Sequence, residues 1–99
     1  MKVRFDQSGG FAGLMRSCEI DTTDMSPDEA NKFADLVSSI PESGVFLSDS
    51  SRDLHQYEIT IVDGESKTSV VFDDQSVPQS VKPLIGYLKK CSKPSKPGE

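Results

Sequence analysis

A pair of adjacent glycines, Gly9 and Gly10, constrains the fold of this chain more than any other feature of its sequence. The pair follows residues 1–6, where apolar and polar side chains alternate as they do in a half-buried strand. Glycine adopts positive φ without steric cost, so two glycines between strand-like runs predict a tight β-hairpin. We expect the second strand over residues 11–20, and Gly13 within it predicts a bulge or a close approach of another backbone.

Each of two hairpins is followed by a segment with the periodicity of an amphipathic helix. In the first segment, Ser26 is a good N-cap, Pro27 suits the first helical position and Glu29 completes a capping box. Its apolar stripe consists of Ala30, Phe33, Ala34, Val37 and Ile40. The second helix is expected over residues 78–90, with Pro83 in its first turn, where a missing N–H needs no partner. Its stripe consists of Val81, Leu84, Ile85 and Leu88.

The second hairpin lies between these helices. Residues 55–62 and 67–73 alternate like strands, and Asp63-Gly64 between them is a strong turn signal. The order β-β-α-β-β-α predicts an α+β fold, in which an antiparallel sheet of about four strands carries two helices packed on one face. Residues 1–90 are expected to form a single domain, and residues 91–99, rich in lysine, proline and serine, a disordered tail.

The charge and the cysteines limit the possible partners and compartments. The 99 residues carry a net charge of −5 at pH 7, so the chain lacks the positive field that binds nucleic acid or an anionic membrane surface. Cys18 and Cys91 lie far apart and do not indicate a disulfide framework. We therefore expect a cytoplasmic, monomeric protein with reduced thiols, and no signal peptide or membrane-spanning segment.

The sequence offers little that could catalyse a reaction. His55 is the only histidine, and a pair with Cys18 on a neighbouring strand is conceivable, but no third residue is placed to orient it. Two carboxylate pairs, one at residues 73–74 and one within residues 49–53, lie beside turns, where acidic residues are common for local hydrogen bonding. A hydrolytic pair also needs a cleft, for which a small domain has little room. We expect no enzymatic activity, no metal site and no cofactor.

Two interpretations of Phe11 stay open. If Leu14 and Cys18 face the core, Phe11 has the opposite parity and is exposed, where an aromatic side chain suits a binding anchor. A bulge at Gly13 would reverse this parity and bury the ring.

Three stretches together resemble one known family. They are Ser8-Gly9-Gly10-Phe11-Ala12-Gly13-Leu14, then Asp53-Leu54-His55-Gln56-Tyr57-Glu58-Ile59-Thr60, then Val77-Pro78 through Lys82-Pro83-Leu84-Ile85. Their order and spacing resemble the emfourin family of small bacterial proteins, which is named for an inhibitor of protealysin, a thermolysin-like zinc metalloprotease. The resemblance implies an intracellular, non-enzymatic protein that binds such a protease and blocks its active-site cleft.

The binding mode that this resemblance implies uses loops at the end of a rigid sheet. An apolar side chain, from Phe11 or from the Val45-Phe46-Leu47 patch, would enter a substrate pocket. A carboxylate, such as Asp49 or Asp53, or a main-chain carbonyl would approach the protease zinc. The residues expected to bind the partner are Ser8, Gly9, Gly10, Phe11, Phe46, Asp49 and Asp53. The alternative is a non-enzymatic regulatory or adaptor module that binds a non-protease protein through an exposed sheet edge.

Overall fold

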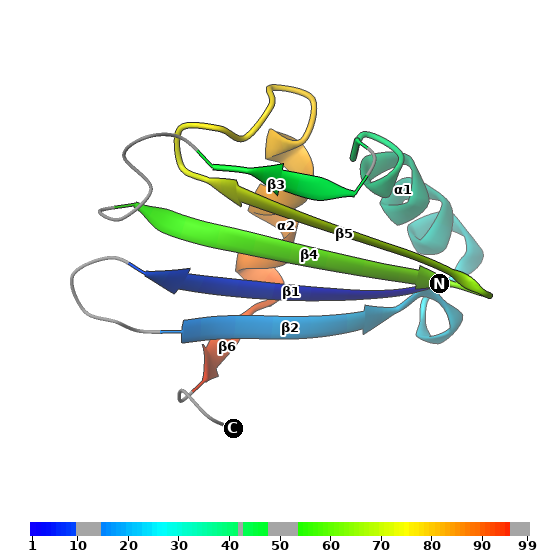
Figure 1. Ribbon diagram of the computed structural model, residues 1–99. Coiled ribbons are helices and arrows are strands. Elements are labelled where there is room, and N and C mark those ends of the chain that lie inside the picture. Colours follow the sequence, from blue (N-terminus) through cyan, green and yellow to red (C-terminus); the bar gives the residue numbers. More distant parts are fainter. Residues whose placement is uncertain (10–14, 42, 48–53, 96–99) are drawn as a thin grey trace.

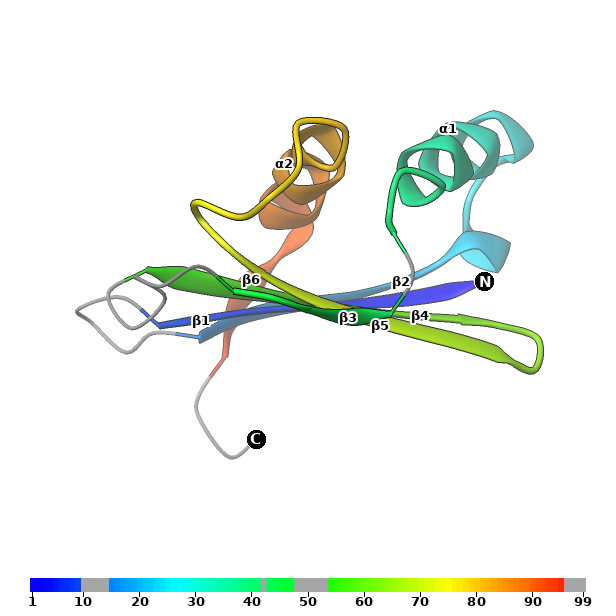
Figure 2. The ribbon, with the colours of Figure 1, turned by 45° about the horizontal axis from the view of Figure 1, so that its top comes forward.

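The computed structural model describes residues 1–9, 15–41, 43–47 and 54–95, and the structural statements below concern these residues. In chain order, the elements are β1 (Lys2–Gly9), β2 (Met15–Asp21), the short 3₁₀-helix η1 (Thr22–Asp24), α1 (Pro27–Val37), β3 (Gly44–Phe46), β4 (His55–Asp63), β5 (Ser66–Asp73), α2 (Lys82–Cys91) and β6 (Lys93–Ser95). They form two layers, a twisted sheet and a pair of helices that lie on the same face of it (Figure 1, Figure 2). The predicted α+β class is confirmed.

The sheet contains six strands in the order β3-β5-β4-β1-β2-β6. Its four inner strands are antiparallel and correspond to the two predicted hairpins. The sequence did not predict the outer strands, which are three residues long: β3 pairs parallel to β5, and β6 pairs antiparallel to β2. Three residues are too few for an alternating pattern to be recognised, so only the pairing partner reveals such a strand.

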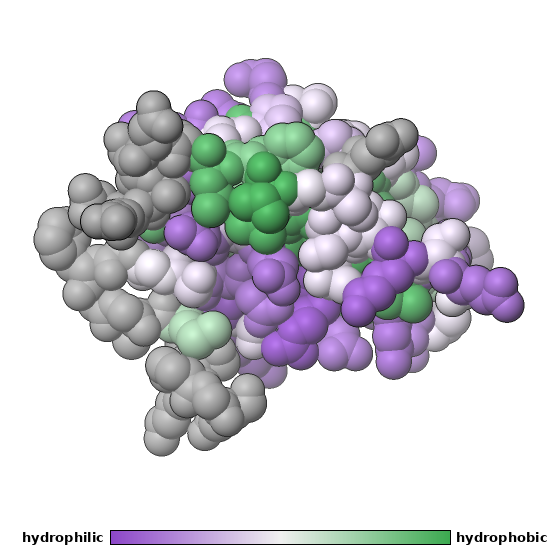
Figure 3. Space-filling model, viewed as in Figure 1, coloured by the Kyte–Doolittle hydropathy of each residue, from purple (hydrophilic) through white to green (hydrophobic). Residues whose placement is uncertain are grey.

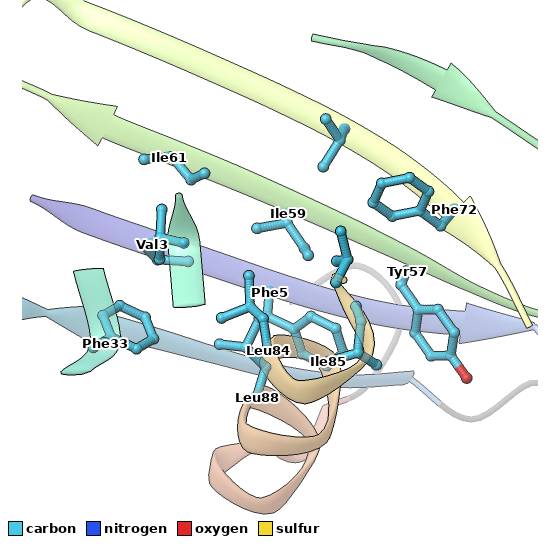
Figure 4. Packing of buried hydrophobic residues seen from close by; sticks show 13 residues of the cluster. Val3, Phe5, Phe33, Tyr57, Ile59, Ile61, Phe72, Leu84, Ile85 and Leu88 are labelled. Carbon is cyan, nitrogen blue, oxygen red and sulfur yellow. The ribbon is translucent and has the colours of Figure 1, made fainter. Parts of the chain in front are cut away.

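The register of the inner strands collects their apolar side chains on the face beneath the helices. Phe5 of β1 lies opposite Cys18 of β2 and Ile59 of β4. α2 packs Leu84 and Leu88 onto this face (Figure 4). The buried hydrophobic core consists of Val3, Phe5, Phe33, Val37, Tyr57, Ile59, Ile61, Val70, Phe72, Val81, Leu84, Ile85 and Leu88. The predicted apolar parities of the strands are therefore confirmed.

The opposite face of the sheet, which we call the open face, is polar at its centre. Arg4 at its centre contacts Asp6 (Nε–Oδ2 3.0 Å) and Glu19 (Nη1–Oε2 3.8 Å). Lys2 lies 3.8 Å from the same Glu19. Exposed ion pairs stabilise a fold little, and Figure 3 shows hydrophilic residues across the centre of this face.

Both helices form where local sequence signals favour them. Ser26 Oγ accepts a hydrogen bond from the Glu29 amide (3.3 Å), which confirms the predicted N-cap of α1. α2 begins at Lys82, within the predicted segment but after its first residues. Residues 79–81 form a turn, closed by a hydrogen bond from the Val81 amide to the Pro78 carbonyl (2.9 Å), and Pro83 then lies in the first helical turn.

The C-terminal part of the chain is tied to β2. The sequence predicted disorder from residue 91, whereas α2 runs through Cys91 and Lys93–Ser95 pair with β2. Arg16 holds the junction, because its Nε donates to Ser92 Oγ (3.1 Å) and its Nη2 to the Ser92 carbonyl (2.9 Å). Residues 96–99 lie outside the described residues, and the division into one domain and a tail stays a prediction.

We predict that Ser26→Ala lowers the free energy of unfolding by about 1 kcal/mol, because the Glu29 amide loses its side-chain acceptor. Ser26→Asp should stay close to the wild type, since an aspartate accepts the same hydrogen bond and favours the positive end of the helix dipole. Urea unfolding of the three proteins measures both effects. An unchanged midpoint for Ser26→Ala would contradict the capping role.

Candidate functional site

Five strands meet at one end of the sheet, which we call the loop end. β1, β3 and β5 end there, and β2 and β4 begin there (Figure 1). The strand directions require this, because β4 runs antiparallel to β1 and β5, while β3 runs parallel to β5. Residues 10–14 and 48–53, which hold most of the predicted binding residues, connect strands at this end.

The structure brings together the predicted binding residues that it describes. Ser8 and Gly9 are the last residues of β1, and Phe46 is the last residue of β3, so all three lie at the loop end. The other four predicted residues, Gly10, Phe11, Asp49 and Asp53, lie outside the described residues. Their role, the bulge at Gly13 and the orientation of Phe11 stay predictions.

The backbone conformation and the surroundings of Gly9 require a residue without a side chain. It pairs with His55 and has φ +93°, a conformation that side chains disfavour. A Cβ on Gly9 would lie 2.8 Å from the Leu54 carbonyl oxygen. Gly9 therefore allows the end of β1 to contact the backbone that leads into β4.

Asp74, the residue after β5, joins three groups at the loop end. Its Oδ1 accepts a short hydrogen bond from the Tyr57 hydroxyl. Its Oδ2 accepts a hydrogen bond from the His55 amide (3.0 Å) and lies 3.3 Å from His55 Nδ1. His55 begins β4, and Asp74 begins the turn toward α2. These contacts therefore link the start of β4 to the segment between β5 and α2. We call these three residues the Asp74 network.

The Asp74 network was not predicted from the sequence, although the register of the second hairpin contains a signal for it. The second hairpin pairs Asp63 with Ser66, and the same register continues to Gln56 and Asp73. One further step in this register brings Asp74 beside His55. Extending the hairpin register by one residue predicts the contact between His55 and Asp74, whereas the adjacency of Asp73 and Asp74 in the sequence does not.

The two adjacent carboxylates have different roles. Asp73 is fully buried, and its Oδ1 accepts hydrogen bonds from the amides of Gln75 (2.8 Å) and Ser76 (2.9 Å). This confirms the prediction that Asp73 serves local turn formation. Burial acts to raise the pKa of Asp74, but the hydrogen bonds from Tyr57 and the His55 amide outweigh it and hold that pKa below its ordinary value.

Tyr57 links the Asp74 network to the core. Its ring is buried and stacks on Phe5, with 6.1 Å between the ring centroids, while its hydroxyl reaches Asp74 (Figure 4). Burial, together with the hydrogen bond to Asp74, raises the pKa of Tyr57 above its usual value. At neutral pH the network therefore pairs a neutral phenol donor with a carboxylate anion.

A hollow of about 270 Å³ opens beside the Asp74 network. It is lined by Tyr57, Asp74, Val77, Lys82, Ile85, Gly86 and Lys89. The Lys89 ammonium lies 4.7 Å from the centroid of the Tyr57 ring, within the range of a cation–π contact.

The described residues do not assemble a catalytic or metal-binding set. Cys18 lies opposite Phe5, and His55 lies opposite Gly9, so about 13 Å along the strands separates them and the conceivable Cys–His pair does not form. Burial raises the pKa of the Cys18 thiol to about 11, and this thiol donates to the Leu88 carbonyl (3.7 Å). No described group of three or more His, Cys, Asp or Glu residues could hold a metal ion. Nor is any helix in this part long and apolar enough to cross a membrane.

An exposed apolar group lies along β3 near the loop end. The exposed fractions of Val45, Phe46 and Leu47 are 68%, 39% and 39%. We call these residues the β3 patch, and Figure 3 shows a hydrophobic area over this strand. The Phe46 ring stacks on the buried Phe72 ring, with 5.4 Å between the centroids. The core thus holds Phe46 in position while part of its ring stays accessible.

We predict that Gly9→Ala lowers the free energy of unfolding by at least about 2 kcal/mol, because it adds a backbone clash to an unfavourable φ. Gly64→Ala is the matched control. Gly64 has φ +61°, and a Cβ there would meet no atom within 4 Å, so only the conformational cost of about 1 kcal/mol applies. Chemical unfolding measures both variants, and equal losses would contradict the clash with Leu54.

We expect Asp74→Asn to lower the free energy of unfolding at pH 7, because an amide is a weaker acceptor for Tyr57 and His55. The folded pKa of Asp74 is depressed, so the stability that its carboxylate contributes is fully present above the unfolded value of about 3.9. It is lost as the pH falls below that value and through the lower folded pKa. The difference from the wild type should therefore shrink below about pH 4. Asp63→Asn, at the far end of β4, is the control and should stay near the wild type. A deficit independent of pH would count against this linkage.

A comparison with protein-family models matches residues 5–89 to the Emfourin family. The matched span begins within β1 and ends within α2, and between them it includes β2, α1, β3, β4, β5 and the Asp74 network. No curated protein and no solved structure matches the chain. Because the family model covers well over half of the sequence, the chain belongs to the Emfourin family.

Proposed function

We propose that this protein inhibits an intracellular thermolysin-like zinc metalloprotease of the protealysin type, by covering the active-site cleft with its loop end. The observation that carries this proposal is the membership of the Emfourin family. The resemblance in the sequence associates this family with inhibition of such a protease.

The geometry of the loop end supports this proposal. A protease inhibitor gains affinity when its contact loops are already ordered, because binding then costs less conformational entropy. Here the strand ends beside both loops are held by internal contacts, Gly9 against Leu54 and His55 against Asp74. The binding surface proposed on this frame comprises Ser8, Gly9, Gly10, Phe11, Phe46, Asp49 and Asp53.

Within this surface we assign two kinds of contact. Phe11 or Phe46 supplies an apolar side chain for a hydrophobic substrate pocket, as buried aromatic anchors do in other interfaces. Asp49 or Asp53 supplies a carboxylate oxygen near the protease zinc, since carboxylates are ordinary zinc ligands. Both contacts are non-catalytic, because neither requires a group of this chain to react.

A titration of the purified protein against a thermolysin-like protease, preferably one encoded in the same genome, tests the proposal. We expect stoichiometric loss of peptide hydrolysis, with this protein remaining uncleaved. Full protease activity, without a complex in size-exclusion chromatography, would instead favour an adaptor module that binds a non-protease protein.

We predict that Phe11→Ala weakens inhibition by about 2 kcal/mol or more, roughly thirtyfold, if Phe11 is a central anchor. Val62→Ala is the control, because Val62 is 40% exposed on the open face at the opposite end of β4. Inhibition constants and circular dichroism spectra of both variants separate loss of binding from loss of folding. Unchanged inhibition by a folded Phe11→Ala variant would remove Phe11 from the interface.

A further inference from the structure

The two edges of the sheet differ in how they are protected from pairing with another chain. An edge strand exposes unpaired backbone groups, and proteins commonly protect it with lysine or proline. β6, at one edge, contains both Lys93 and Pro94. β3, at the other edge, contains no charge and no proline, and Leu47 directly after it is also apolar. Within the described residues, β3 pairs with a strand on one side only.

The β3 edge is apolar on both faces of the sheet. Val45 lies beside Val71 in the register, and Phe46 lies beside Phe72, whose ring it stacks on. Successive residues of a strand point to opposite faces, so Val45 belongs to the open face and Phe46 to the helix face. A strand that pairs with this edge would therefore meet apolar side chains above and below its backbone.

The fold holds the β3 edge in place. Ser43, just before the strand, accepts a hydrogen bond at Oγ from the Ser69 amide of β5 (3.1 Å). Gly44 leaves room for the Phe46 ring, since a Cβ there would lie 3.1 Å from the ring. The strand is thus fixed at its beginning by β5 and near its end by the stack on Phe72.

We propose that β3 pairs along its outer edge with an extended, uncharged and apolar segment of the inhibited protease, which adds a strand to the sheet. This inference rests on the proposed function and names the backbone contact through which the inhibitor would hold its target. Strand addition supplies affinity through main-chain hydrogen bonds and specificity through the flanking side chains. The β3 patch provides those side chains.

The length of β3 favours a protease over a second copy of this chain. Three paired residues cover about 10 Å, and two such edges bury on the order of a few hundred Å². Stable interfaces bury about 1,200–2,000 Å², so β3 alone is too small to hold a dimer. The same edge is continuous with the loop end, where Phe46 already belongs to the proposed binding surface, and a protease bound there contacts both.

Backbone amides provide the first test. Hydrogen exchange of the full-length protein is compared by NMR with and without an equimolar amount of the protease, inactivated by a substitution that leaves its zinc bound so that no cleavage occurs. We expect slower exchange for at least one amide of residues 44–47 in the complex, by tenfold or more. Exchange of the Lys93 and Ser95 amides at the β6 edge should remain unchanged because that edge is not part of the interface. Unchanged exchange throughout residues 44–47 in a formed complex would overturn the proposal.

A pair of matched substitutions provides the second test. Val45→Lys places a charge on the β3 edge, and Val62→Lys places the same charge on an exposed valine of the inner strand β4. Both valines belong to the open face. Because Val62 lies between Lys2 and Lys67 in the register, circular dichroism and urea unfolding establish that each variant is folded before inhibition is compared. We expect Val45→Lys to weaken inhibition at least tenfold and Val62→Lys to change it less than twofold. Equal effects of the two variants would overturn the assignment to β3.

The outcomes separate this inference from the function on which it rests. A wild-type protein that does not inhibit the protease contradicts the proposed function itself. In a second outcome, the wild-type protein inhibits the protease while the β3 amides stay unprotected and Val45→Lys inhibits as strongly as the wild type. That combination contradicts only the strand addition. A dimer in sedimentation experiments that Val45→Lys dissociates would assign the β3 edge to a second copy of the chain and overturn the proposal.

Discussion

The pairing of β1 with β4 through the centre of the sheet supports the rest of the structure. It places Val3 beside Ile61 and Phe5 beside Ile59, and all four side chains are at most 9% exposed. Full burial of a side chain of this size contributes about 1.5–3 kcal/mol relative to exposure. A slip of one residue would turn the buried face of a strand toward solvent, so the hydrophobic effect determines this register.

The same register determines the geometry of the loop end. It makes Gly9 and His55 the last pair between β1 and β4, and β5 then brings Asp74 beside His55. Tyr57 joins the two regions, because its ring belongs to the core and its hydroxyl binds Asp74. The supports of the proposed binding loops are therefore continuous with the hydrophobic core, which gives a partner an ordered frame to contact.

The distribution of polar and apolar surface concentrates possible contacts at one corner of the molecule. The helices cover one face of the sheet, and interacting charges such as Arg4 and Glu19 occupy the centre of the other. The β3 patch lies beside the loop end, whereas β6 at the opposite edge contains lysine and proline. A single surface that combines an edge strand and loops is consistent with the proposed inhibitor.

Signals between neighbouring residues were sufficient to predict much of this fold. The cap at Ser26, the turn at Asp63-Gly64 and the alternation within each inner strand depend on short stretches of chain, so the sequence by itself determined the hairpins, the helices, the α+β class and the likeness to a family. Strand order, the short strands β3 and β6 and the contacts of Asp74 were decided only by the tertiary structure. They depend on pairings between segments that are distant in the chain, and the burial of side chains between those segments stabilises the pairings only once the fold is complete.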